Sequence, residues 1–128
     1  MADWTVCGIL LSSRGQRATM LIMMPQTNDV MAMIAEIVRS VVPGARVVLF
    51  GSHARGTAAP MSDYDILVVT EQSLRPRDKL ALRTQVRKRL LEKRVLSDIL
   101  VQSDEEIRRK KDLPGHIVRS ILREGVSL

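Results

Sequence analysis

Residues 51–69 read GSHARGTAAPMSDYDILVV, and this stretch decides the fold. It directly follows Arg46–Phe50, an apolar and β-branched run that predicts a strand ending at Gly51. Glycine, proline and serine in the next ten residues predict a short helical turn and then a loop. From Asp63 to Thr70 the sequence predicts a second strand, and its unbroken apolar centre is typical of a strand covered on both faces.

Helical patterns surround these two strands. Apolar residues recur at helical spacing from Thr27 to Val42, and a second amphipathic pattern runs from Pro76 to Lys93. The other predicted elements are a strand at Val95–Val101, a helix that Ser103 caps and that ends near Lys111, and a short helix that opens at Pro114 and ends at Gly125. We therefore expect the α/β (α+β) class, with a small mixed sheet covered by helices, although the pattern does not fix which strands run parallel.

Length and charge restrict the possible partners. The chain has 128 residues, enough for one domain with its own core. Its 20 Lys and Arg against 14 Asp and Glu give a net charge of +6, which favours phosphate-rich partners such as nucleotides, nucleic acid or an acidic protein. The aromatic residues are only Trp4, Phe50 and Tyr64, so base stacking is not favoured as a binding mode. The basic run Arg108–Lys111 is interpreted as a solvated face rather than a nucleic-acid site.

The N-terminal residues and the cysteine content bear on location. The single Cys7 cannot form an internal disulfide, and no apolar run approaches the roughly 20 residues of a membrane span. We therefore expect a cytoplasmic protein without a membrane segment. Residues 1–24 are not expected to be a signal peptide, because Arg14 and Arg17 interrupt their apolar run. They are either a strand against the sheet edge or a loosely attached extension upstream of a start near Met24, and the predicted domain is 25–128.

Three acidic residues are the strongest candidates for chemistry. Asp63 and Asp65 are two apart, so on a strand they would share a face, roughly 6.6 Å apart along the backbone. Asp98 lies in the third predicted strand and would join them if that strand is adjacent. Each pair of such charges about 4 Å apart repels by roughly 4 kcal/mol at an effective dielectric near 20, and a cation relieves that conflict. The set therefore predicts two Mg²⁺ ions and a phosphate-bearing substrate.

A less specific interpretation gives each acid a separate task. In that interpretation Asp63 caps a loop, Asp65 pairs with an arginine and Asp98 lies near an exposed strand edge. The glycine turn just upstream favours the metal site over these independent roles.

Gly51 and Ser52 are predicted to bind the phosphates. A glycine lets backbone amides approach an anion closely, and Ser52 adds a hydroxyl at the head of the helical turn. Arg55 is either a further phosphate contact or a solvated surface residue. His53 is predicted to be a structural or a surface histidine, because no second residue defines a triad with it and magnesium prefers oxygen ligands.

These residues resemble a known group of enzymes. Gly51-Ser52, ten intervening residues, and Asp63-x-Asp65 match the signature of the DNA polymerase beta-like nucleotidyltransferase superfamily. The small size is similar to that of the minimal nucleotidyltransferases, or MNT proteins, from about Thr27 to the C-terminus. The resemblance implies that Asp63, Asp65 and Asp98 bind two Mg²⁺, that Asp98 helps to activate the attacking hydroxyl, and that Gly51-Ser52 holds the triphosphate.

Many minimal members are antitoxins of HEPN/MNT pairs, which implies transfer of AMP from ATP to a tyrosine of a HEPN ribonuclease toxin. One alternative is a small-molecule nucleotidyltransferase similar to aminoglycoside-modifying enzymes, working as a homo-oligomer. Another is a non-catalytic module that binds a toxin or nucleic acid, which the intact acids do not favour.

Overall fold

The computed structural model describes residues 27–59 and 61–128. The chain divides after Met31, and the unit Ala32–Leu128 is the one described below. The predictions for residues 1–24, including the boundary at residue 25, lie outside the described residues. Within the described part, none of the helices combines the length and apolar character needed to cross a membrane.

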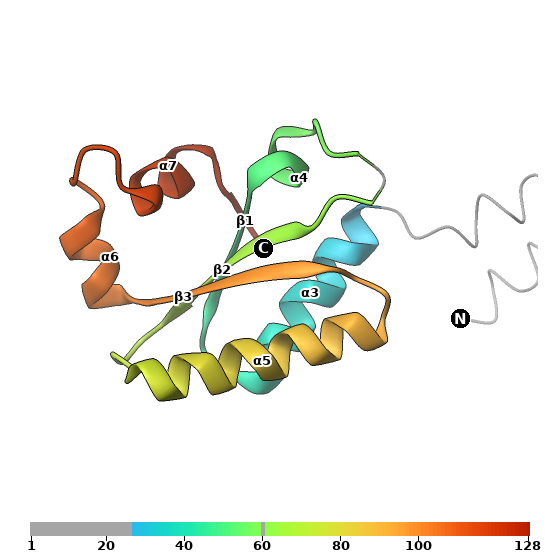
Figure 1. Ribbon diagram of the computed structural model, residues 1–128, viewed down its shortest axis with the longest axis horizontal. Helices are drawn as coiled ribbons and strands as arrows, with labels where there is room; N and C mark the ends of the chain where they lie inside the picture. Colours follow the sequence, from blue (N-terminus) through green and yellow to red (C-terminus); the bar gives the residue numbers. More distant parts are fainter. Residues whose placement is uncertain (1–26, 60) are drawn as a thin grey trace, which may run out of the picture. The chain divides into compact units, whose positions relative to one another are not determined.

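A four-stranded mixed sheet forms the centre of this unit (Figure 1). Its strands are β1 (Arg46–Phe50), β2 (Tyr64–Thr70), β3 (Ser97–Ser103) and β4 (Val126–Ser127), in the order β3-β2-β1-β4. The β2 and β3 strands run parallel, whereas β1 is antiparallel to both β2 and β4. This arrangement confirms the predicted small mixed sheet of the α/β class.

Helices cover both faces of the sheet. In the described residues they are α3 (Thr27–Val41), α4 (Gly51–Arg55), α5 (Pro76–Glu92), α6 (Asp104–Lys110) and α7 (Ile117–Glu124). One cluster joins Leu67 and Val69 of β2 to Ile107 of α6 and Val118 of α7. Since side chains alternate along a strand, the neighbours of Leu67 face the opposite layer, where α5 runs along β3 (Figure 1). Ile66–Val69 are all buried, as the unbroken apolar run predicts.

Two predicted boundaries are wrong, and local contacts explain both. The third strand was expected at Val95–Val101 but spans Ser97–Ser103, because its register follows pairing with all seven residues of β2. The last helix was expected to open at Pro114 but begins at Ile117. There the imidazole Nδ1 of His116 accepts a hydrogen bond from the Val118 amide at 3.1 Å and caps the helix. A smaller difference is that Asp63 precedes β2 instead of opening it.

Candidate active site

The candidate site lies where β1 ends and β2 and β3 begin. The strand register pairs Phe50 with Asp65, and it pairs Asp65 with Asp98 on the other side. Both aspartates lie on the sheet face of Leu67 and Leu100, which α6 and α7 cover further along the strands. Asp63 is exposed and stands just before β2. The fold therefore brings the acidic residues of two separate sequence segments to one end of the sheet.

Gly51 is fitted to the carboxylate of Asp65. Its φ of +75° lies in the left-handed region, where side chains other than glycine are strained. A Cβ built on Gly51 would lie 2.9 Å from Cγ and 3.2 Å from Cβ of Asp65, and would collide with the carboxylate oxygen Oδ2. The turn between β1 and α4 thus needs glycine for its backbone conformation and for the space that Asp65 occupies.

The electrostatics of Asp65 reflect the crowding of like charges. Burial raises the pKa of its carboxyl, and the charges of Asp98 and Asp63 raise the pKa further. His53 and Arg55 act in the opposite direction and lower it. These surroundings disfavour the charged form of Asp65, and a bound cation would relieve the repulsion.

The oxygen donors at this site fit magnesium. Within residues 27–59 and 61–128, no three side chains of His, Cys, Asp or Glu form a ready-made metal cage. Magnesium, however, is usually held by one or two carboxylates and completes its shell with substrate phosphates and water. Asp65 and Asp98, with Asp63 beside them, match that incomplete donor set. When bound, the metal would supply positive charge that offsets the carboxylates and polarises a phosphate group.

The turn that follows β1 carries the residues predicted to bind phosphate. Gly51 and Ser52 open α4, whose first-turn amides donate no hydrogen bond to the side chain of the N-cap residue Phe50. Arg55, at the end of α4, lies 3.4 Å from the Glu124 carboxylate of α7. Both side chains of this pair are about half exposed, at 52% and 46%, so the contact is weak and can be exchanged for another anion.

His53 has a structural task at this site, as the sequence predicts. Its ring stacks on Tyr64 with the centroids 3.6 Å apart and the planes 10° from parallel. Its Nε2 atom lies 2.8 Å from the carbonyl oxygen of Ser62. These contacts tie α4 to the residues just before β2, so His53 and Tyr64 help to position the loop that ends in Asp63.

Sequence reasoning missed a groove that Asp63 lines and that lies on the α5 side of the sheet. The groove has a volume of about 410 Å³ and extends from Asp63 and Ser97 along the second half of α5. Ser97 is 8% exposed, and its hydroxyl has no hydrogen-bond partner among the described residues. No local signal could reveal this feature, because Asp63 meets the other lining residues, Thr84 to Ser97, only through the pairing of β2 with β3.

A small mixed sheet with aspartates where two neighbouring strands begin agrees with the class of nucleotide-transferring enzymes. A family model identifies the family. The model described as nucleotidyltransferase domain matches residues 31–128, so the chain belongs to the nucleotidyltransferase domain family. This family generally works with a nucleotide donor and a divalent metal. No curated protein matched the sequence.

Several solved structures share the fold. A toxin-antitoxin with AMP-PNP is 22% identical, with a TM-score of 0.53 over 75% of this chain and 69% of that chain. A mutant of the toxin-antitoxin MntA-HpeT is 21% identical, with a TM-score of 0.54 over 77% and 70% of the two chains. A candidate nucleotidyltransferase from Sulfolobus solfataricus is 25% identical, with a TM-score of 0.52 over 77% and 75%. These likenesses agree with the polymerase beta-like nucleotidyltransferase fold.

Proposed function

We propose that the chain transfers AMP from ATP to a tyrosine hydroxyl of a HEPN-type ribonuclease toxin and so acts as its antitoxin in the cytoplasm. The observation that carries this proposal is the register of Asp65 opposite Asp98, with Gly51 fitted against the Asp65 carboxylate. The proposal is supported by this proximity, because acidic side chains are the ligands that a magnesium ion prefers and a glycine turn suits a triphosphate. The fold is shared with a toxin-antitoxin that was solved with AMP-PNP, an analogue of the proposed donor.

Each candidate residue has a task in the proposed reaction. Asp63, Asp65 and Asp98 would hold two Mg²⁺, and Gly51 and Ser52 would hold the triphosphate with Arg55 as a further cation. The acceptor oxygen forms a bond to the α-phosphorus, and the bond between that phosphorus and the α,β-bridging oxygen breaks. Pyrophosphate leaves with the electron pair of that bond. Asp98, exposed at the start of β3, would receive the proton of the acceptor hydroxyl.

Transfer of the correct phosphorus is the first test. The purified chain is incubated with Mg²⁺, a HEPN protein encoded beside it, and ATP labelled at either the α- or the γ-phosphate. We expect the partner to gain label from the α-phosphate only. Asp65→Asn should abolish this labelling. Asp112→Asn, the same change at an exposed position of the loop between α6 and α7, should leave it intact.

Other outcomes would contradict the proposal in different ways. An unlabelled partner, or equal labelling with Asp65→Asn, would reject the antitoxin activity. Label on an aminoglycoside without any partner would favour a small-molecule enzyme. RNA binding that weakens steeply with salt and is unchanged in Asp65→Asn would favour a binding module.

A further inference from the structure

The outer face of α5 is exposed although it carries leucines. This helix runs along the outside of the sheet layer (Figure 1), and only Val86 and Leu90 of its 17 residues are buried. Leu80 and Leu91 are 53% and 58% exposed. Exposed apolar side chains that gather on one surface mark interaction sites, whereas single ones are ordinary. The arrangement of these leucines therefore decides whether α5 has a binding face.

The two leucines belong to one stripe of α5. The stripe consists of four exposed residues at spacings of four, three and four, namely Leu80, Thr84, Arg87 and Leu91. This is the spacing with which one helix packs along another. At about 100° per residue, Arg89 lies on the other side of the helix from the stripe. There it donates a hydrogen bond to the Ser40 hydroxyl of α3 at 2.8 Å. The stripe thus faces away from α3.

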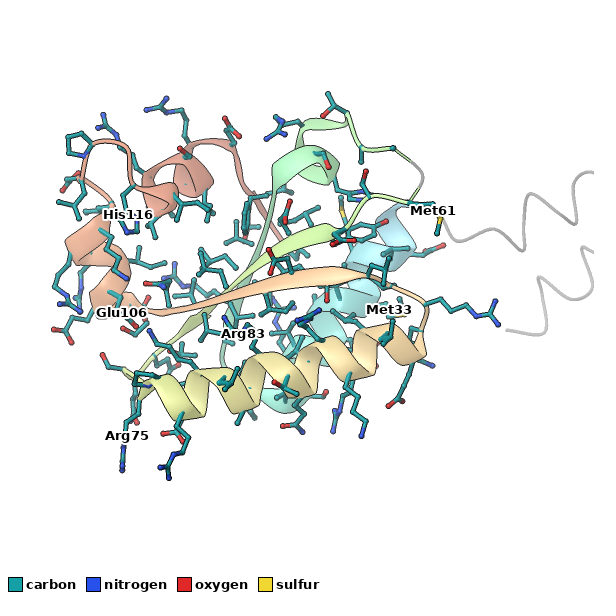
Figure 2. The ribbon with its side chains drawn as sticks, viewed as in Figure 1. Met33, Met61, Arg75, Arg83, Glu106 and His116 are labelled. Carbon is teal, nitrogen blue, oxygen red and sulfur yellow. The ribbon has the colours of Figure 1, made fainter. Side chains whose placement is uncertain are left out.

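Cations flank the α5 stripe on both sides. Arg83 lies on one side of it (Figure 2), and Arg77 and Lys88 lie on the other. All three are exposed, and none forms an ion pair with an acidic residue within residues 27–59 and 61–128. The whole of α5 has six Lys and Arg against two acidic residues. A ligand with negative charge on both sides of an apolar seam matches this pattern.

The groove on the α5 side of the sheet continues the stripe past the end of the helix. Leu91, Val95 and Leu96 form its aliphatic part, and Leu96 is 46% exposed. Its volume of about 410 Å³ is ample for an apolar side chain of a partner. The apolar surface therefore runs from Leu80 to the residues that precede β3.

The charge and the leucines together select one kind of occupant. A second copy of this chain would bring two cationic seams together, and their like charges would repel. Nucleic acid would leave Leu80 and Leu91 against polar phosphates, and no aromatic side chain lines the groove for a base to stack on. A helix with apolar residues at the same spacing and acidic residues beside them would bury the leucines and pair with the cations.

We propose that the α5 stripe binds an acidic amphipathic helix of a partner protein. The partner helix carries apolar residues on its seam and Asp or Glu on both sides of that seam. This binding goes beyond the transfer reaction, because it requires none of the groups of the candidate active site. Asp65 and Asp98 lie on the sheet face that α6 and α7 cover, whereas α5 covers the other face.

A synthetic peptide tests the stripe directly. The probe is a fluorescein-labelled helix of about 20 residues, with leucines at the spacing of the stripe and glutamates on both sides. Its fluorescence anisotropy is measured while the full chain is added. We expect saturable binding at least about tenfold tighter than that of a peptide of the same composition whose leucines are dispersed around the helix. Raising the salt from about 50 to 150 mM should weaken the binding, because the cations are exposed.

A charge reversal beside the stripe should have the larger effect. Arg83→Glu/Lys88→Glu should weaken binding of the probe at least about tenfold, because it places like charges on both sides of the seam. The matched control is Arg108→Glu/Arg109→Glu, the same change of charge at exposed positions of α6. It should stay within about twofold of the wild type, so net charge alone cannot explain a difference between the two variants.

A polar substitution within the stripe makes the test independent of charge. Leu91→Asn should weaken binding of the probe by about three- to tenfold, since it removes apolar area from the seam. Leu113→Asn is the matched control, because Leu113 is a leucine outside the stripe that is 47% exposed. Asp65→Asn should bind the probe as tightly as the wild type does. Circular dichroism should confirm that all variants are folded.

Several outcomes would overturn the assignment of the stripe. Absence of saturable binding up to about 1 mM, or equal binding of the dispersed peptide, would show that α5 does not bind such a helix. Binding of duplex RNA that disappears in Arg83→Glu/Lys88→Glu, without binding of the probe by the wild type, would assign the stripe to nucleic acid. A dimer of the wild type that Leu91→Asn dissociates would assign it to a second copy of this chain. Failure of AMP transfer would reject the proposed function and leave the binding of the probe unaffected.

Discussion

Acidic residues at the two ends of β3 have opposite electrostatic environments. At its start, Asp98 lies opposite Asp65 with Asp63 close by, and these like charges repel. At its end, Ser103 caps α6, and Glu106 completes a capping box by accepting a hydrogen bond from the Ser103 amide at 3.1 Å (Figure 2). Lys79 donates to the same carboxylate at 2.6 Å.

The pKa values of the two ends show the difference. Burial and the neighbouring aspartates raise the pKa of Asp65. Burial also acts to raise the pKa of Glu106, but the hydrogen bonds from Lys79 and the Ser103 amide outweigh it and lower the pKa to about 2. One end of the strand therefore stabilises the fold, while at the other end the aspartates repel one another and a bound cation would relieve that repulsion. This contrast is expected where a small domain places chemistry on a rigid sheet.

The largest expected effect comes from neutralising Asp65 in the acidic cluster. Asp65→Asn should lower transferase activity by at least about a hundredfold, because it removes a carboxylate that is proposed to bind the metal. The same change should stabilise the ligand-free protein by up to roughly 1 kcal/mol, since it removes a charge that folding makes unfavourable. The sign follows from the raised pKa of Asp65, which means that folding loses stability as the pH rises through its ordinary titration range.

Thermal unfolding with and without Mg²⁺-ATP checks both parts of this prediction. The variant should melt above the wild type without ligand and below it with ligand. A variant that melts below the wild type in both conditions would mean that Asp65 stabilises the fold and would remove the contrast between the two ends.

Gly51→Ala should give the next largest effect. The new Cβ collides with the Asp65 carboxylate and also has to adopt a φ of +75°. We expect activity to fall by about ten- to a hundredfold and stability to fall by roughly 2 to 3 kcal/mol. The control is Gly56→Ala, which has the same φ of +75° but no atom within 4 Å of the added Cβ.

The difference between these two alanine variants isolates the collision from the backbone strain. Gly56→Ala should lose only about 1 kcal/mol and keep most of its activity. Urea unfolding and initial rates measure the two quantities. Equal losses in both variants would show that the close approach of Gly51 to Asp65 contributes nothing.

The parts of this contrast that depend on local patterns can be predicted from the sequence. The strand Arg46–Phe50 was placed correctly since Gly51 ends it, and the capping of α6 was visible in Ser103 followed by Glu106. Asp98 was predicted to join Asp65 only on the condition that its strand is adjacent, because that adjacency depends on a parallel pairing that no local pattern encodes. For the same reason the partnership of Lys79 with Glu106, 27 residues apart, appears only in the folded chain.

The contribution of Glu106 to stability at the Ser103 end of β3 can be tested with Glu106→Gln. This variant should lose roughly 1 to 3 kcal/mol of stability at pH 7 with little change in activity, since it weakens a capping box and an ion pair that is mostly buried. Because the folded pKa is lowered from 4.5 to about 2, the charge stabilises the fold fully above pH 4.5 and loses its effect as the pH falls towards 2. The stability difference from the wild type should shrink over that interval.

Unfolding by urea at pH 7, 4.5 and 3 measures this change. Glu105→Gln is the matched control, because Glu105 also lies in the first turn of α6 but is exposed and outside the capping box. A Glu106→Gln deficit that stays constant with pH would show that packing rather than charge holds this end of the strand.

The smallest expected effect concerns Arg55, which lies in neither the acidic cluster nor the capping box and is about half exposed. Its exposed pair with Glu124 contributes little to stability, so Glu124→Gln should change the free energy of unfolding by less than about 0.5 kcal/mol. If Arg55 contacts the phosphates as proposed, releasing it from Glu124 should lower KM for ATP by about two- to threefold, with kcat unchanged. Glu92→Gln, an exposed position at the end of α5, removes the same charge elsewhere. A KM that falls equally in both variants would reflect net charge alone, and an unchanged KM in Glu124→Gln would leave Arg55 as a surface residue.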